Sequence, residues 1–202
     1  MTTFADLTAG LPPFEGFASI TRLSRQIIIT EKIDGTNASV TVLEDGRVIA
    51  GSRNRYVFDP KDHFGFPGWV AEHIDELRTL GVGRHFGEWW GAGIQRRYGL
   101  GASGEKRFSL FNVSRWSDEA DARPACCHVV PTLYRGVFDT AAIQRCVDAL
   151  VDGGSVAAPG FMKPEGVVVF HVPSGSLFKF TLDNNDGHKG ADITAGNGGS
   201  GE

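Results

Sequence analysis

The chain has 202 residues, 41% of them apolar and 22% charged, which describes one globular domain, or one domain with a small appendage. Its formal net charge of −4 excludes a broad basic field, so any site for a polyanion would have to be a local patch. No apolar run is long enough to cross a bilayer and no signal sequence opens the chain. We therefore expect no membrane partner, and a cytoplasmic protein or a viral protein acting in the host cytoplasm.

The cysteines point to a reducing compartment. There are three, and Cys126 and Cys127 are adjacent, so they do not form a disulfide framework. His128 follows the pair, but no second pair of ligands stands at the spacing of a zinc finger, so we do not expect a zinc site here.

The first third of the chain predicts antiparallel strands. Residues 26–30, QIIIT, are continuous and β-branched, and residues 38–42, ASVTV, alternate with period two after the turn DGT. A further hairpin is predicted over residues 43–50, LEDGRVIA, with Asp45 and Gly46 in its turn. Together these segments predict an antiparallel meander.

The middle of the chain predicts one helix between strands. Residues 68–80, GWVAEHIDELRTL, carry apolar side chains at helical spacing, and Gly81 ends the helix. Residues 84–91, RHFGEWWG, and 107–116, RFSLFNVSRW, each predict a strand. A polar, acidic loop with Pro124 follows the second strand.

The last third predicts a helix and a hairpin. The helix starts after Asp139 as its N-cap and ends at paired glycines. Residues 165–172, EGVVVFHV, and 177–182, LFKFTL, are β-rich on either side of PSGS, which predicts the hairpin. We expect residues 1–182 to form one domain and residues 183–202, rich in Gly, Asn and Asp, to be a mostly mobile tail. The fold class is α+β, an antiparallel sheet with flanking helices.

Lys32 leaves two interpretations open. It stands in the segment TEKIDGTNASV, residues 30–40, between Glu31 and Asp34. A lysine with acidic neighbours at the end of a strand is most often an exposed cation in a weak ion pair. A lysine amine that has lost its proton is instead a nucleophile. The tetrapeptide K-x-D-G alone does not decide between them.

Further segments follow Lys32 in a fixed order. They are GSRN (51–54), GEWWGAGIQ (87–95), FSLFNV (108–113), PEGVVV (164–169) and LFKF (177–180). With EKIDGTN, this set resembles the covalent nucleotidyltransferase superfamily, which comprises ATP- and NAD-dependent polynucleotide ligases and mRNA capping enzymes. It looks most like the RNA ligases of the double-strand-sealing type. The resemblance covers residues 28–181 and implies the antiparallel-sheet, ATP-grasp-like nucleotidyltransferase domain.

The resemblance implies an ATP-dependent RNA ligase that joins 5′-phosphate and 3′-hydroxyl ends through a lysyl-AMP intermediate. Lys32 matches the nucleophile that attacks the α-phosphorus of ATP, and Lys179 matches the lysine that contacts the AMP phosphate. Glu165 and Asp34 are expected to hold Mg²⁺ or Mn²⁺, and Asp34 also to take part in catalysis. The negative charges of nearby carboxylates disfavour loss of the Lys32 proton, and a divalent ion bound among them would cancel that effect.

The resemblance also implies contacts to the nucleotide. They are expected from Glu31, from Asn37 near the phosphates or the acceptor ends, from Arg53 to a ribose or the leaving phosphate, from Glu88 to a ribose hydroxyl, and from Phe111 stacked on adenine. Phe108 is expected in the core instead.

Two departures from the group's pattern qualify this hypothesis. Thr181 stands where these ligases commonly carry a second lysine, and no foldable sequence follows Leu182, where related enzymes continue into a further domain. We therefore expect either a domain of a longer enzyme or a minimal enzyme.

The expected partner is RNA, as a nicked duplex or as broken ends, while the sequence does not predict the oligomeric state. IQRRYG, residues 94–99, is either a surface that binds a nucleic-acid backbone or a solvated loop. The alternatives are a DNA ligase or capping-type transferase, a non-ligating module that binds nucleotide or RNA ends, and a transferase that hands AMP to another acceptor.

Overall fold

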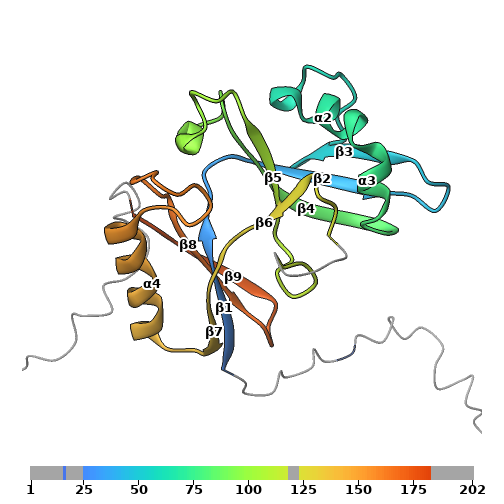
Figure 1. Cartoon of the computed structure of the whole chain (residues 1–202). Coiled ribbons are helices and arrows are strands. Elements are labelled where there is room, and N and C mark those ends of the chain that lie inside the picture. Colours follow the sequence, from blue (N-terminus) through green and yellow to red (C-terminus); the bar gives the residue numbers. More distant parts are fainter. Residues whose placement is uncertain (1–15, 17–24, 118–122, 183–202) are drawn as a thin grey trace, which may run out of the picture.

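The computed structural model describes residue 16 and residues 25–117 and 123–182, which form two β-sheets with helices at their outer sides (Figure 1). The α+β fold expected from the sequence is confirmed. The predicted tail, residues 183–202, and the acidic part of the predicted loop lie outside the described residues. No helix among the described residues has the length and apolar character that crossing a membrane requires.

The first sheet has the strand order β7-β1-β8-β9, and all of its neighbouring strands are antiparallel. The second sheet has the order β3-β2-β4-β5-β6, in which only β6 runs parallel to its neighbour. The strands are β1 (Gln26–Lys32), β2 (Thr36–Val42), β3 (Val48–Ser52), β4 (Gly83–Gly91), β5 (Lys106–Leu110), β6 (Cys127–Val129), β7 (Thr132–Val137), β8 (Gly166–His171) and β9 (Ser176–Thr181). The helices are α2 (Phe66–Glu72), α3 (Ile74–Arg78) and α4 (Thr140–Gly153), with 3₁₀ turns η1 (His63–Gly65) and η2 (Arg97–Gly99).

β1 is buried on both faces, as its continuous apolar sequence requires. Ile27 and Ile29 pack with residues of α4 and β8 on one face. Ile28 and Thr30 border a cleft on the other face, because side chains alternate along a strand. The same alternation turns Lys32 toward the cleft.

The predicted meander is wrong in its pairing. β1 pairs with β7 and β8, whereas β2 pairs with β3 and β4 in the other sheet. A strand that is apolar on both faces is stable in the middle of a covered sheet, so β1 takes two neighbours there. The chain passes between the sheets at residues 33–35, where a side chain on Gly35 would overlap the carbonyl oxygen of Trp89.

The predicted helix over residues 68–80 is two short helices, α2 and α3. The backbone leaves the helical region at His73 (φ −113°, ψ 21°), where the His73 ring nitrogen Nδ1 also bonds the carbonyl oxygen of Trp69 at 2.9 Å. Both helices still cover the second sheet, with Val70 and Leu77 buried in its core as the spacing predicted.

The other predicted elements are mostly confirmed. The β2–β3 hairpin turns at Gly46 (φ 82°), and the Asp139 carboxylate accepts a hydrogen bond from the Ala141 N–H at the start of α4. The strand predicted over residues 107–116 ends earlier, at Leu110, because the next residues turn and line the cleft. β6 and β7 were not predicted, since β6 has only three residues and β7 is a largely exposed edge strand.

Gly166, the first residue of β8, gives a direct test of this packing. Its φ is 149°, and a Cβ there would overlap the Phe180 carbonyl oxygen on β9. We expect Gly166→Ala to lower the free energy of unfolding by at least about 3 kcal/mol in urea titrations. Gly175→Ala is the matched control: Gly175 has a φ of 66° but open space around it, so about 1 kcal/mol is expected. Equal losses for both variants would contradict the packing described here.

Candidate active site

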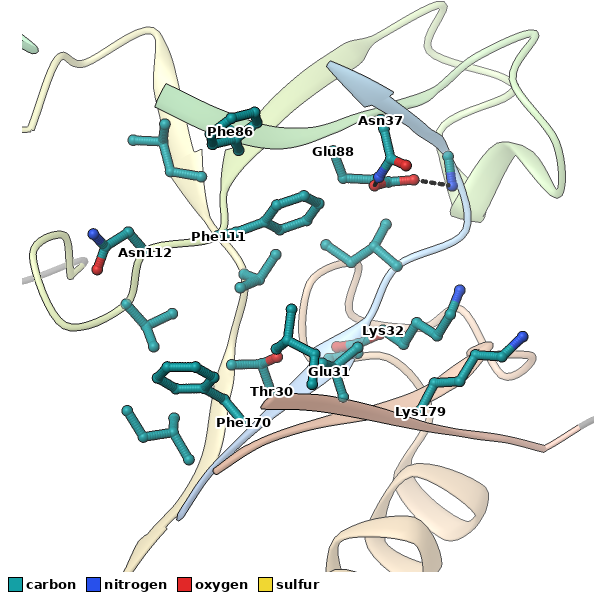
Figure 2. A pocket seen from close by; sticks show the side chains of 18 of the residues that line it. Thr30, Glu31, Lys32, Asn37, Phe86, Glu88, Phe111, Asn112, Phe170 and Lys179 are labelled. Carbon is teal, nitrogen blue, oxygen red and sulfur yellow. Dashed lines mark hydrogen bonds between the residues drawn. The ribbon is translucent and has the colours of Figure 1, made fainter. Parts of the chain in front are cut away.

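A cleft of about 920 Å³ separates the two sheets, and most of the residues singled out in the sequence lie along it (Figure 2). One wall is formed by the inner faces of β1, β8 and β9. The other wall comes from β4, the start of β2 and the turn after β5. The six segments that the sequence places in order therefore meet at one site.

Lys32 and Glu165 form an ion pair at one end of the cleft. Lys32 is the last residue of β1 and lies opposite Gly166 in the ladder with β8, so its side chain meets that of the preceding residue, Glu165. The Lys32 Nζ donates to Glu165 Oε1, and the side chains are 24% and 14% exposed. The second carboxylate oxygen of Glu165, Oε2, is buried and has no hydrogen-bond partner among the described residues.

Lys179 lies on the same wall of the cleft. It stands opposite Val168 on β8, and Val168 in turn stands opposite Thr30 on β1, so all three share one cross-strand row. Figure 2 shows the Lys32 and Lys179 side chains extending toward the same end of the cleft. Two cations therefore line one wall, as anionic phosphate groups would require.

Glu88 faces these lysines from the second sheet. Its carboxylate accepts hydrogen bonds from the Gly35 N–H at 3.1 Å and from Asn37 Nδ2 at 3.2 Å. Asn37 lies opposite Glu88 in the β2–β4 ladder. Burial raises the pKa of Glu88 to about 7, and the positive charge of Lys32 offsets part of that rise. The carboxyl group therefore binds a proton more readily than an exposed glutamate does.

Asp34 does not join the other acids. Its Oδ2 accepts a hydrogen bond from Arg96 Nε at 2.8 Å in a half-buried ion pair. Among the described residues, no group of three or more His, Cys, Asp or Glu side chains is arranged to hold a metal ion. Asp34, which was expected to hold the metal with Glu165, is paired with Arg96 instead, and Glu165, with its unpartnered buried oxygen, is the carboxylate that fits a metal.

Glu31 is placed differently from the expectation. Its side chain is 1% exposed, with Oε1 bonded by the Tyr98 hydroxyl at 2.9 Å and Oε2 by the backbone N–H groups of Val156 and Ala157, each at 2.9 Å. Both carboxylate oxygens are thus engaged within the protein, although Glu31 also borders the cleft. Glu31 anchors the end of β1 to the loop before β8, and its expected contact to the nucleotide stays a prediction.

The remaining candidates border the cleft as expected. Phe111 is 40% exposed and its ring points into the cleft (Figure 2). Phe108 is fully buried in the core. Arg53 is exposed and has no side-chain hydrogen bond or ion pair within the part of the chain that the structure describes. Its guanidinium is available to an anion.

Two further residues, one lining the cleft and one buried behind it, were not singled out from the sequence. Phe86 is 57% exposed and lines the cleft two positions before Glu88, so strand alternation from Glu88 could have indicated it. Tyr98, in the segment IQRRYG, is completely buried, so that segment is not simply a solvated loop or a surface for nucleic acid. Its role depends on tertiary contacts that no local pattern indicates.

Comparison with protein families matches residues 25–181 to the model named RNA ligase. The chain belongs to the RNA ligase family. The resemblance identified in the sequence is therefore confirmed. No curated protein sequence matches this family member.

Solved structures of an RNA ligase from Naegleria gruberi share the fold. Those most similar include the enzyme with PPi (TM-score 0.58, 21% identity), a variant with AMP and Mn (0.58, 20%) and a variant with ATP and Mn (0.57, 18%). Each alignment covers 78% of this RNA ligase family chain and 50% of the Naegleria chain. The chain thus spans about half the length of those ligases.

The raised pKa of Glu88 predicts how the stability of this RNA ligase family chain depends on pH. The folded state favours the protonated carboxyl, so its stabilising effect is complete below the usual pKa of 4.5 and is lost as the pH rises through about 7. The loss is up to about 3 kcal/mol. We expect Glu88→Gln to flatten this part of the profile in urea unfolding measured from pH 5 to pH 8. Parallel profiles for the two proteins would contradict a buried, proton-binding Glu88.

Proposed function

We propose that this chain forms a covalent lysyl-AMP on Lys32 from ATP, as the first step in sealing 5′-phosphate and 3′-hydroxyl ends of RNA. The observation that carries the proposal is the Lys32 amine, which faces a cleft of nucleotide size beside the buried carboxylate of Glu165. Membership of the RNA ligase family supports it. So do the Naegleria ligase structures, which hold ATP or AMP with Mn.

In the proposed step, the Lys32 Nζ attacks the α-phosphorus of ATP. A nitrogen–phosphorus bond forms, the bond between the α-phosphorus and the bridging oxygen breaks, and pyrophosphate leaves with that electron pair. The Lys32 ammonium first loses one proton to become a nucleophile, and in this proposal Glu165 Oε1, which is hydrogen-bonded to Nζ, receives it. A second proton leaves the nitrogen to solvent as the nitrogen–phosphorus bond forms.

The other cleft residues position the nucleotide in this proposal. Phe111 offers an aromatic face to adenine, and Glu88, held by Gly35 and Asn37, offers an oxygen to a ribose hydroxyl. Lys179 and Arg53 place positive charge along the phosphates, where catalysis of phosphoryl transfer is mainly a matter of positioning and electrostatics.

A divalent cation fits this site through Glu165. Its unpartnered oxygen Oε2 is a hard anionic ligand, and Mg²⁺ commonly takes only one or two carboxylates together with substrate phosphates and water. Such an ion, Mg²⁺ or Mn²⁺, supplies positive charge that neutralises the triphosphate. Asp34, which is paired with Arg96, is then an organiser of the loop after Lys32 rather than a ligand.

The later steps require the protein to bind RNA, either as a nicked duplex or as broken ends. Transfer of AMP to a 5′-phosphate and attack by a 3′-hydroxyl would use the same cleft after pyrophosphate has left. Because the net charge of this chain is −4, any contacts that it makes to RNA phosphates would come from local arginines and lysines.

Substitution of Lys32 tests the proposed nucleophile. After incubation with α-labelled ATP and Mg²⁺ and denaturing electrophoresis, we expect label on the wild type and none on Lys32→Ala. Lys32→Arg is the matched control, since it keeps the positive charge beside Glu165 but cannot form the adduct. Label retained on either variant, or no label on the wild type with ATP, GTP or NAD, would contradict the proposal.

Thr181 allows a test of the departure from the family pattern. It pairs with Gly166, which pairs with Lys32, so position 181 lies in the same cross-strand row as the proposed nucleophile. We expect Thr181→Lys to raise the rate of the slowest step by several-fold in sealing assays on nicked RNA, because it adds a cation near the phosphates. A neutral or harmful effect would show that position 181 is not a lost lysine.

A further inference from the structure

The segment of residues 91–101 is unusually constrained for a connection between two strands. Gln95, Arg97 and Tyr98 all have positive φ angles, of 43°, 60° and 40°, although none is a glycine. Such backbone angles are unfavourable for residues with a Cβ and persist only where surrounding contacts enforce them. The contacts that hold this segment in place therefore indicate its function.

The strained segment carries the Tyr98 hydroxyl to the end of β1. That hydroxyl donates its proton toward Glu31 Oε1 at 2.9 Å or the Lys32 carbonyl oxygen at 3.2 Å, and it accepts a hydrogen bond from the Glu165 N–H at 3.1 Å. Burial raises the pKa of Tyr98 above its ordinary value, so the hydroxyl keeps its proton at neutral pH. One oxygen atom thus links the Glu165 N–H to the end of β1, through either the Glu31 carboxylate or the Lys32 carbonyl oxygen.

The position of this contact in the ladder makes it specific. Lys32 and Gly166 are the last pair between β1 and β8, so Glu165 lies one residue beyond the paired region. Its backbone is held instead by the Tyr98 hydroxyl on the N–H and by the Leu182 N–H on the carbonyl oxygen, at 2.8 Å. Without the hydroxyl, one of these two restraints is lost.

Packing fixes the Tyr98 ring itself. The ring lies edge-on to Trp90, with 5.6 Å between ring centroids, and 4.6 Å from the ring of Phe161. Tyr98 is completely buried and is not among the residues that line the cleft. It therefore acts on a nucleotide in the cleft through the cleft residues that it contacts, among them Lys32 and Glu165.

We infer that Tyr98 is a positioning residue for lysine adenylylation, which fixes the backbones of Lys32 and Glu165 so that the amine and the carboxylate meet in the geometry needed for attack on ATP. This inference rests on the proposed function. Because a misplacement of about 1 Å can cost as much as 10²-fold in rate, loss of the hydroxyl should slow the chemical step while leaving nucleotide binding intact.

The test is the rate of AMP transfer to the protein in a single turnover, measured over a range of ATP concentrations. For Tyr98→Phe we expect the rate constant at saturating ATP to fall about tenfold, with the half-saturating ATP concentration unchanged within twofold. A purely structural effect would lower the fraction of molecules that take label and leave the rate constant of the remainder unchanged.

Tyr134→Phe is the matched control, because the Tyr134 hydroxyl also bonds the backbone, at the Val137 carbonyl oxygen 3.0 Å away, but outside the cleft. Its rate constant should equal that of the wild type. A Tyr98→Phe rate within twofold of the wild type, or a raised half-saturating ATP concentration with an unchanged rate, would overturn the inference alone. A wild type that takes no label would overturn it together with the proposed function.

Glu31→Gln provides a second variant if Tyr98→Phe does not fold. The amide keeps the shape of the side chain but turns an N–H donor toward the Tyr98 oxygen, where it competes with the Glu165 N–H. We expect the same pattern, a lower rate at saturating ATP with unchanged half-saturation. An unchanged rate would overturn the role assigned to the Tyr98 hydroxyl.

Discussion

The ion pair between Lys32 and Glu165 is the interaction on which the rest of the cleft depends. It joins the last residue of β1 to the residue before β8, where the first sheet faces the second. Both side chains are largely withdrawn from water, so their attraction is stronger than on an open surface, and removing one partner would leave a poorly solvated charge. The same contact holds the amine beside the group that can take its proton.

The fold places this pair between a packed apolar core and the cleft. Behind it, Ile27 and Ile29 of β1 pack against α4, so the strand that carries Lys32 is fixed on its far face. In front of it, residues 33–35 cross directly to the second sheet, where Gly35 and Asn37 hold Glu88. A short length of chain therefore sets the separation between an amine on one wall and a carboxylate on the other.

The sequence was a good guide where a local pattern decides the structure. The alternating strands, the Asp139 cap of α4 and the ordered segments around Lys32, Phe111 and Lys179 all appear as predicted. It was a poor guide where distant contacts decide. Periodicity cannot show that β1 leaves β2 to pair with β7 and β8, and acidity cannot separate the buried anchor Glu31 from the cleft carboxylates. Those roles follow from contacts between residues that are far apart in sequence.

The most direct test of this account is to locate the modified residue. The protein would be incubated with ATP and Mg²⁺, digested under conditions that preserve phosphoramidates, and mapped by mass spectrometry. We expect one AMP moiety on the peptide that contains Lys32, attached at the side-chain nitrogen. Treatment of the intact protein with pyrophosphate before digestion should remove it, because the step is reversible. AMP attached to any other residue, or no adduct at all, would contradict this account.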